Sequence, residues 1–250
     1  VGLGQGKTLV LPSDGYYVSR MFSAGFLAPY GVRIIEAPIL KMQDFDYSGV
    51  DVVLLESPSN PGLDLCDIAA ISAKVHAAGG IVMVDNTTMT PLLQRPLDLG
   101  ADVVLASDTK APAGHSDVLF GHVASRNAAF MARVLDWRRL SGAVPGAFEA
   151  WLLHRGLETL ELRLARMCAS AEVIATRLLD SGLVQNLRYP GLKSDASYPL
   201  ACKQMQGFGF IMGFDLPSAD VAEAFLTNCP FIAQATSFGS THSSGERRAR

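Results

Sequence analysis

Short, almost wholly apolar segments that alternate with helix-like segments are the feature that most constrains how this chain can fold. They lie at residues 8–11, 32–37, 51–55, 81–84, 103–106 and 118–123. Helix-like segments lie between some of them, at residues 64–78 and 91–99, and the first ends at a Gly-Gly pair that commonly stops helices. Strands that are apolar on both faces are typical of parallel sheets covered by helices. The sequence therefore predicts an α/β fold built on a mainly parallel sheet.

The pattern changes near residue 144, which predicts a second domain. Residues 148–180 carry apolar side chains at helical spacing, with a bend or break expected at Gly156. Further strands and a helix are expected after it, at residues 186–189, 208–214, 219–226 (the helix, with Ser218 as its N-cap) and 231–237. We predict a large domain over residues 1–143, with its N-terminal part absent. Residues 144–250 are expected to form a linking helix and a smaller α+β domain, incomplete at its C-terminal end.

Charge and hydropathy exclude several classes of partner. The 250 residues carry a formal net charge of −3, which argues against nucleic acid or an anionic membrane as the main partner. No apolar run approaches the roughly 20 residues of a membrane-spanning helix, and no signal-peptide pattern opens the sequence. The four cysteines have neither a CxxC pair nor metal-ligand spacing, so we expect reduced thiols and a cytoplasmic location.

Polar side chains follow three of the apolar segments at the point where each ends. They are residues 56–60, Asp85 and residues 107–110. Because ligands of open α/β sheets bind beyond the carboxyl ends of the strands, we expect these groups to gather along one edge. Lys110 is the most informative of them, since burial lowers the pKa of a lysine towards that of a nucleophilic amine, as a Schiff-base lysine requires.

These residue types suit pyridoxal phosphate chemistry. That cofactor needs a lysine for its aldehyde, a carboxylate for its ring nitrogen and hydrogen-bond donors for its phosphate. Lys110, Asp85, and Ser107 with Thr109 supply the three.

Other chemistries fit the same sequence less well. His115, Asp117 and His122 are residue types that bind metals, but they lack a HExxH spacing or a carboxylate cluster, so no metal site is predicted. No serine lies in a GxSxG motif, which argues against Ser-His-Asp hydrolysis. The segment Gly2-Leu-Gly-Gln-Gly-Lys-Thr8 lacks the first glycine of a phosphate-binding P-loop.

Several short motifs occur along the chain in one particular order. They are Glu56-Ser-Pro-Ser-Asn-Pro61, Val84-Asp-Asn-Thr87, Thr90-Pro-Leu-Leu-Gln-Arg-Pro96, Ser107-Asp-Thr-Lys110, Gly114-His-Ser-Asp117, Tyr189-Pro-Gly-Leu192 and Ser237-Phe-Gly239. This ordered set resembles the trans-sulfuration branch of the fold-type I pyridoxal-phosphate enzymes, the family of the cystathionine gamma-lyases, gamma-synthases and beta-lyases and of the methionine gamma-lyases. The resemblance covers nearly the whole chain and implies the fold-type I architecture.

The resemblance implies a role for each of seven residues. They are Lys110 as the amine that bonds to the cofactor, Asp85 as the partner of its ring nitrogen, Tyr16 stacked on its ring, Asn60 near its phenolic oxygen and the substrate, Ser107 and Thr109 on its phosphate, and Ser237 near the substrate carboxylate. Of these, Lys110, Asp85 and Tyr16 are the implied catalytic residues.

The sequence departs from the family's pattern at two places. Tyr17-Val18 replace a double glycine next to Tyr16, and Thr236 stands where many gamma-acting members carry a glutamate. The family's phosphate loop before the first strand, its N-terminal tyrosine-and-arginine segment and its late substrate-binding arginine are not found in this sequence.

By this resemblance we expect a pyridoxal-phosphate-dependent carbon–sulfur lyase that converts cystathionine to cysteine, 2-oxobutanoate and ammonia. Gamma-replacement on an acylated homoserine, beta-lyase and methionine gamma-lyase activities stay open, as does a scaffold protein that has lost the cofactor. The resemblance also implies a homotetramer built from dimers, acting on a small amino-acid substrate.

Overall fold

A computed structural model of the chain describes residues 3–248, which belong to two compact units. Unit 1 consists of the chain up to residue 106 together with residues 122–145. Unit 2 consists of residues 107–121 together with the chain from residue 146 onward. The chain therefore enters unit 2 twice, first in the loop that carries Lys110. The outer limits of the two predicted domains, residues 1–2 and 249–250, lie outside the described residues.

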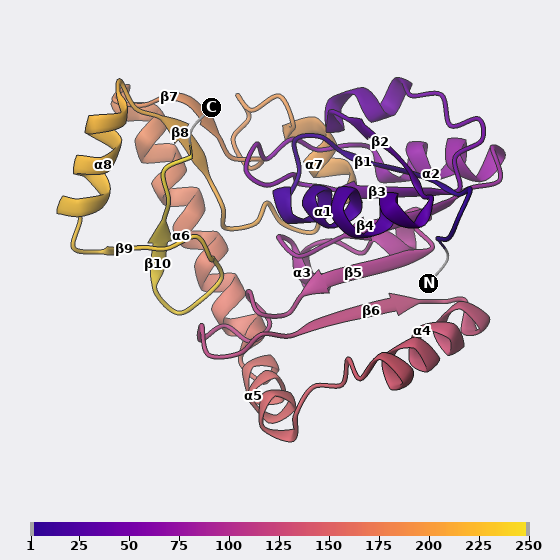
Figure 1. The fold of residues 1–250 in the computed structure, drawn as a ribbon. Helices are drawn as coiled ribbons and strands as arrows, with labels where there is room; N and C mark the ends of the chain where they lie inside the picture. The colour runs from indigo at the N-terminus through magenta and orange to yellow at the C-terminus, as the bar shows by residue number, and fades with distance from the viewer. Residues whose placement is uncertain (1–2, 249–250) are drawn as a thin grey trace. The chain divides into compact units, whose positions relative to one another are not determined.

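A six-stranded sheet organises unit 1 (Figure 1), in the order β2-β1-β3-β4-β5-β6. Its strands are β1 (Thr8–Pro12), β2 (Arg33–Ala37), β3 (Val52–Glu56), β4 (Ile81–Asp85), β5 (Val103–Ser107) and β6 (Gly121–Ser125). The neighbours from β2 to β5 pair in parallel, and β6 runs in the opposite direction at the edge. The predicted mainly parallel α/β sheet is confirmed.

Both faces of this sheet bury apolar side chains, because successive residues of a strand point to opposite faces. From β1, Val10 joins the cluster that packs against α2 (Ile68–Ala77), where Ile71 is fully buried. Leu9 and Leu11 belong to the cluster on the opposite face. The strands β3 and β4 alternate in the same way. This two-sided burial explains why the strands appear in the sequence as continuous apolar runs.

The remaining helices of unit 1 are short or exposed. They are α1 (Tyr17–Phe22), a π-helical turn (Ser23–Leu27), 3-10 turns (Ala28–Tyr30, Ile39–Asp44, Pro96–Leu99), α3 (Thr90–Leu93) and α4 (Ala128–Ser141). Helix α2 begins later than predicted because Asp67 is its N-cap and accepts the Ala70 N–H. The single helix predicted at residues 91–99 is wrong, since α3 and a separate 3-10 turn occupy that segment. Helix α4 was not predicted, and none of its residues is buried.

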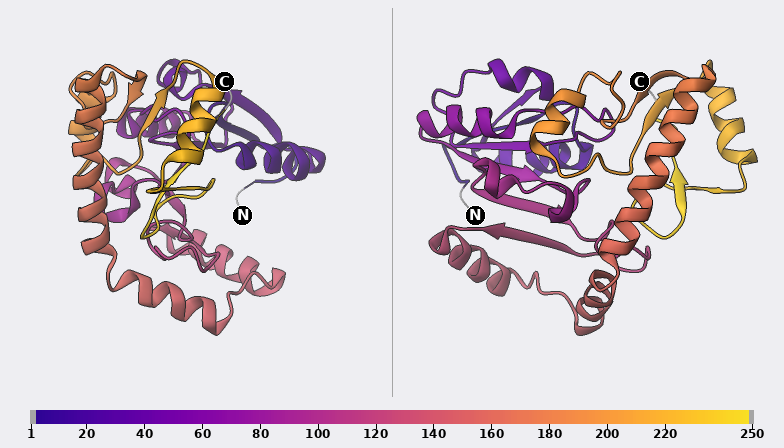
Figure 2. Two further views of the ribbon diagram at one scale, coloured as in Figure 1. Left: turned by 90° about the vertical axis from the view of Figure 1, so that its left-hand side faces the viewer. Right: turned by 180° about the vertical axis from the view of Figure 1, so that it is seen from behind.

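Unit 2 is built around the long helix α6 (Figure 2). Its elements are α5 (Ala147–Leu157), α6 (Leu160–Ser181), β7 (Gln185–Arg188), α7 (Tyr198–Gln204), β8 (Gly213–Asp215), α8 (Ala219–Asn228), β9 (Ile232–Gln234) and β10 (Ser243–Gly245). Strands β7 and β8 pair antiparallel and β9 and β10 parallel. The predicted break near Gly156 is confirmed, as is Ser218 as the N-cap of α8. The strand predicted at 208–214 is wrong in extent, because only its end is regular. None of the helices within residues 3–248 is both long and apolar enough to cross a membrane.

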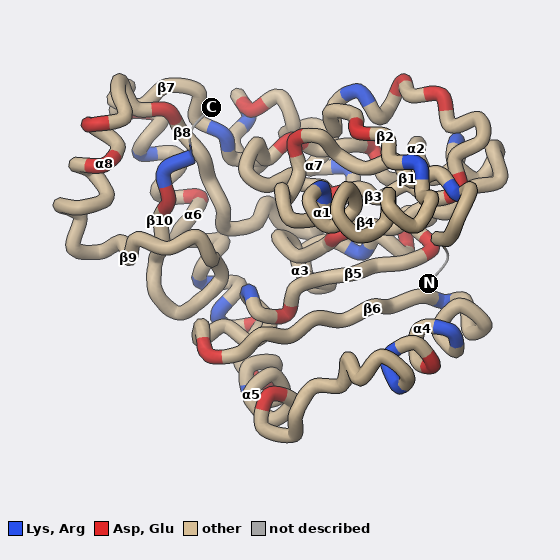
Figure 3. Tube along the Cα trace, in the orientation of Figure 1, with Lys and Arg blue, Asp and Glu red and all other residues tan. Residues whose placement is uncertain are grey.

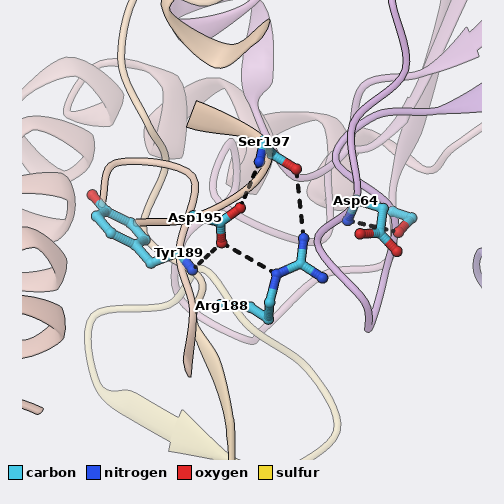
Figure 4. Close-up of polar contacts among 6 residues, drawn as sticks. Asp64, Arg188, Tyr189, Asp195 and Ser197 are labelled. Atoms are coloured by element: carbon cyan, nitrogen blue, oxygen red, sulfur yellow. Dashed lines mark hydrogen bonds and ion pairs between the residues drawn. The ribbon is translucent and has the colours of Figure 1, made fainter. Parts of the chain in front are cut away.

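A fully buried carboxylate in unit 2 joins the end of β7 to the start of α7 (Figure 4). Asp195 pairs with Arg188 Nε at 3.2 Å, and it accepts the backbone N–H groups of Tyr189 at 2.9 Å and Ser197 at 2.8 Å. Each of these bonds offsets part of the cost of removing the charge from water. The network therefore holds the Tyr189 turn in place.

In the five strands of the unit 1 sheet other than β2, charged residues occur only where a strand ends. Strands β1, β5 and β6 have no Lys, Arg, Asp or Glu, and Figure 3 draws β5 and β6 in tan throughout. The single charged residue of β3 is Glu56 and that of β4 is Asp85, each the last residue of its strand. The parallel register pairs these two residues with each other. The sheet therefore sets two carboxylates side by side at its carboxyl edge.

Glu56 is only 7% exposed and ties two segments of unit 1 together. Its Oε2 accepts the Tyr16 N–H at 2.7 Å, and its Oε1 accepts the Asn60 N–H at 2.6 Å. A Cβ on Gly15 would lie 2.6 Å from Oε2, so only glycine allows the chain to approach this closely. Burial, together with the nearby charges of Asp85 and Asp14, raises the pKa of Glu56 to about 7, and the two backbone bonds act against this rise.

The raised pKa of Glu56 predicts a pH-dependent contribution to stability. The folded state binds the proton of the Glu56 carboxyl more tightly than the unfolded chain does. The resulting contribution to the free energy of unfolding is therefore fully present below about pH 4.5 and is lost as the pH rises through about 7. Glu56→Gln cannot titrate. The drop in the free energy of unfolding between pH 5 and pH 8, measured by urea titration, should therefore be smaller in the variant by roughly 2–3 kcal/mol.

Glu36→Gln, at an exposed position of β2, is the matched control for this substitution. Equal pH dependence in Glu56→Gln and the wild type would contradict the assignment.

Candidate functional site

Asp85 ends β4 with a carboxylate that is largely shielded from water. Its Oδ1 accepts the Thr87 N–H at 2.9 Å and the Thr87 hydroxyl at 2.5 Å. Burial raises the pKa of Asp85, and the two bonds from Thr87 act in the opposite direction. Because both of these bonds go to Oδ1, Oδ2 is the oxygen left to accept a hydrogen bond from a ligand. Such a carboxylate gains most from a cationic N–H partner, which would offset its burial.

Tyr16 and Asn60 are held next to this strand edge by their backbones. Both N–H groups bond to Glu56, the residue that pairs with Asp85 in the sheet. The Tyr16 side chain is 42% exposed, at the N-cap position of α1, and its ring meets Tyr17 edge-on at 5.4 Å between centroids. An aromatic ring that is this exposed is suited to stacking on a planar ligand.

Lys110 lies in unit 2, in the loop after β5. Its Nζ donates to Ser237 Oγ at 2.8 Å and lies 5.0 Å from the centroid of the Phe238 ring. Partial burial lowers the pKa of Lys110, since the charged amine loses water. A partly dehydrated amine with one hydroxyl partner is what a nucleophilic lysine requires.

Ser107 and Thr109 flank this lysine within unit 2. The Lys110 N–H donates to the Ser107 carbonyl at 3.3 Å, which closes a turn at the end of β5. The Thr109 hydroxyl donates to the Phe120 carbonyl at 3.2 Å and accepts the Phe120 N–H at 3.0 Å. For Thr109 to donate to a phosphate, its hydroxyl must therefore give up the Phe120 carbonyl.

The structure brings the seven predicted residues together in two groups. Unit 1 gathers Asp85, Tyr16 and Asn60 around Glu56, whereas unit 2 gathers Lys110, Ser107, Thr109 and Ser237. That the two groups share one site stays a prediction. The sequence did not assign a role to Glu56 or to Phe238. The sequence does mark Glu56, because it is the single acidic residue at the end of an apolar strand. No feature of the sequence marks Phe238 as a neighbour of the Lys110 amine.

The alternative metal residues do not converge. The His115 ring bonds the Ala113 carbonyl at 2.8 Å, and both His115 and Asp117 are exposed. No group of three His, Cys, Asp or Glu side chains able to hold a metal ion occurs within residues 3–248.

The residues present fit pyridoxal phosphate. A carboxylate oxygen is left over at Asp85, and Tyr16, whose N–H bonds to the neighbouring Glu56, supplies an exposed aromatic ring. These are the partners that a protonated pyridine ring needs. The Lys110 amine, with its lowered pKa, has the chemistry that an aldehyde needs.

Comparisons with known proteins agree with this donor set. The chain matches the family described as Cys/Met metabolism PLP-dependent enzyme over residues 2–246. A protein of Streptomyces coelicolor provisionally named a cystathionine gamma-lyase is 45% identical over 249 residues, covering 99% of this chain and 63% of the relative. An L-methionine gamma-lyase of Pseudomonas deceptionensis is 37% identical over 255 residues, covering 97% of this chain and 64% of the relative.

A solved structure shows the same fold. Cystathionine gamma-synthase from Xanthomonas oryzae pv. oryzae, in complex with aminoacrylate and cysteine, superposes with a TM-score of 0.92 at 34% identity. The superposition covers 96% of this chain and 63% of that one. The chain thus spans slightly less than two thirds of the length of these relatives. With the family match over nearly all of its residues, the chain belongs to the Cys/Met metabolism family of pyridoxal-phosphate-dependent enzymes, which have the fold-type I architecture.

Proposed function

We propose that the protein is a carbon–sulfur lyase that converts cystathionine and water to cysteine, 2-oxobutanoate and ammonia. The observation that carries the proposal is the Lys110 amine, partly buried, with a lowered pKa and held 2.8 Å from Ser237 Oγ. The choice of cystathionine is supported by the relative from Streptomyces coelicolor, which is similar over nearly the whole chain.

Lys110 is the proposed base and nucleophile. When bound, the cofactor supplies an aldehyde for an amine and a ring that accepts electrons from the substrate. Burial of Lys110 increases the fraction of neutral amine near pH 7, since it lowers the pKa. Once the substrate amine has taken its place, Nζ takes the proton from the alpha carbon of the substrate. Loss of a gamma thiolate also requires removal of a beta proton. Nζ would first return the alpha proton to the cofactor-bound substrate and, neutral again, would then accept the beta proton.

The other predicted residues bind and orient. Asp85 is proposed to accept the ring N–H through Oδ2 and so to keep the ring protonated, while Tyr16 stacks on the ring and Asn60 approaches its phenolic oxygen. Ser107 and Thr109 are the proposed phosphate partners, and Ser237 lies near the substrate carboxylate. Chain connectivity supports a shared site, because Asp85 pairs in the sheet with Leu105, which precedes Lys110 by only five residues.

The proposal extends to assembly and location. We propose that residues 1–143 supply the cofactor-binding domain and residues 144–250 the linking helix and smaller domain of a homotetrameric, cytoplasmic enzyme. Exposed apolar side chains on α1 and the π-helical turn, among them Met21, Phe22 and Phe26, support self-association. The four free cysteines are consistent with a reducing compartment.

Replacing the lysine tests the covalent role. Lys110→Ala should abolish both the visible absorbance of the lysine-bound cofactor and the borohydride-trapped adduct on the peptide containing residue 110. Turnover should fall by about 10²–10⁴, because a base is lost. The measurements are an absorbance spectrum and peptide mapping by mass spectrometry. Lys193→Ala, at an exposed position in the same unit, is the control and should trap the cofactor as the wild type does. An adduct that persists in Lys110→Ala would refute the role.

Product analysis distinguishes the lyase from its rivals. With cystathionine, the protein should release cysteine and 2-oxobutanoate at a kcat/KM at least about tenfold above that for joining acylated homoserine to cysteine, a difference of about 1.4 kcal/mol. The similarity to a gamma-synthase makes the joining reaction the strongest rival. Faster joining would replace the lyase by the synthase, whereas homocysteine and pyruvate would indicate beta-cleavage.

A further inference from the structure

Arg163, in the first turn of α6, bonds to the backbone of the loop that carries Lys110. Its Nη1 donates to the Ala111 carbonyl at 2.8 Å, and its Nη2 donates to the Pro112 carbonyl at 3.2 Å. These are the carbonyls of the two residues directly after the lysine. All of these residues belong to unit 2.

The same guanidinium also bonds to the corner between α5 and α6. Its Nη2 donates to the Gly156 carbonyl at 2.7 Å, and its Nε donates to Thr159 Oγ1 at 3.1 Å. A guanidinium presents five donors in a rigid planar fork, so it can serve carbonyls from two segments at once, which the single ammonium of a lysine cannot match. Arg163 therefore connects the helical corner to the Lys110 loop.

Three glycines allow this close packing. A Cβ on Gly114, whose φ is +75°, would lie 2.0 Å from Nη1 of the arginine. A Cβ on Gly156 would lie 2.4 Å from the Ala113 carbonyl oxygen, and one on Gly239 would lie 2.6 Å from the Ala111 nitrogen. Only glycine fits at such approaches. The loop is thus enclosed by backbone on several sides, and Ala111 and Ala113 are at most 1% exposed.

Arg163 binds the Ala111 and Pro112 carbonyls, and the loop's own hydrogen bonds hold other groups. The Ala113 N–H bonds to the Asp108 carbonyl at 2.9 Å. The Lys110 N–H bonds to Ser107 and the Gly114 N–H bonds to the Lys110 carbonyl at 2.9 Å, so both bonds involve the lysine's own backbone groups. Pro112 has no N–H to contribute. A lysine side chain is long and flexible, so the position of its amine depends on the direction of its backbone and on its far partner, Ser237.

We propose that Arg163 is a positioning residue for Lys110: its guanidinium fixes the peptide groups that follow the lysine and so holds the amine at Ser237 Oγ, ready for a carbonyl compound. The inference rests on the proposed role of Lys110 but not on which sulfur amino acid is cleaved. Arg163 acts through the loop and needs no contact with cofactor or substrate.

Trace acetylation with acetic anhydride, followed across pH by peptide mass spectrometry on cofactor-depleted protein, measures the apparent pKa of Lys110. In Arg163→Met the loop loses two carbonyl bonds and its link to the Gly156 carbonyl, so the amine gains water and its apparent pKa should rise towards about 10.4, the ordinary value for lysine. The concentration of pyridoxal phosphate that half-saturates Lys110, read by borohydride trapping, should rise about tenfold or more. A role in fold stability alone would lower the unfolding temperature and leave both readouts unchanged.

Arg166→Met is the matched control, because Arg166 lies on the same helix at an exposed position. It should leave both readouts as in the wild type. Arg163→Lys keeps the positive charge and the stem without the fork, and should resemble Arg163→Met. It also decides the question if circular dichroism shows that Arg163→Met does not fold.

Wild-type values for Lys110 in a folded Arg163→Met or in Arg163→Lys would overturn the inference. The acetylation readout needs no cofactor, which separates two kinds of failure. A wild-type protein that never traps pyridoxal phosphate at Lys110 contradicts the proposed function, and the effect of Arg163 on the pKa of Lys110 is still measured.

Discussion

The parallel register that sets Glu56 beside Asp85 is the constraint on which the candidate site depends. Two carboxylates at the ends of adjacent strands are both shielded from water, and burial raises the pKa of each. The two carboxylates have different roles. Both oxygens of Glu56 accept backbone N–H groups, which positions Tyr16 and Asn60. Thr87 bonds to only one oxygen of Asp85, so the other can accept a hydrogen bond from a ligand. A cationic ring nitrogen is the partner that would best offset the buried charge of Asp85.

The amine has its own support in unit 2. Lys110 sits on a loop, where a side chain of this length is poorly placed unless both of its ends are held. Ser237 holds the amine and Arg163 bonds to the backbone that follows, so residues far apart in the sequence converge on one lysine. The acid and the amine of the proposed chemistry thus belong to different compact units.

The sequence predicted the sheet and the cofactor chemistry better than it predicted the packing. Continuous apolar strands identified the parallel sheet, because burial on both faces leaves a local signal. Helix α4, which buries no residue, was not predicted. Likewise, Arg163 looked like any polar residue on an amphipathic helix, since its acceptors are carbonyls whose direction depends on tertiary folding. The hydrogen bonds between the Thr109 hydroxyl and the Phe120 backbone could not be predicted from the sequence either, because they join residues 11 positions apart through backbone atoms.

The central claim is that Asp85 and Lys110, from the two units, hold opposite sides of one pyridine ring. A crystal structure of the protein with pyridoxal phosphate tests it most directly. We predict continuous density between Nζ of Lys110 and the cofactor, with an Asp85 carboxylate oxygen about 2.7–2.9 Å from the ring nitrogen. A cofactor bound with its ring nitrogen facing away from Asp85, or joined to a different lysine, would contradict the claim.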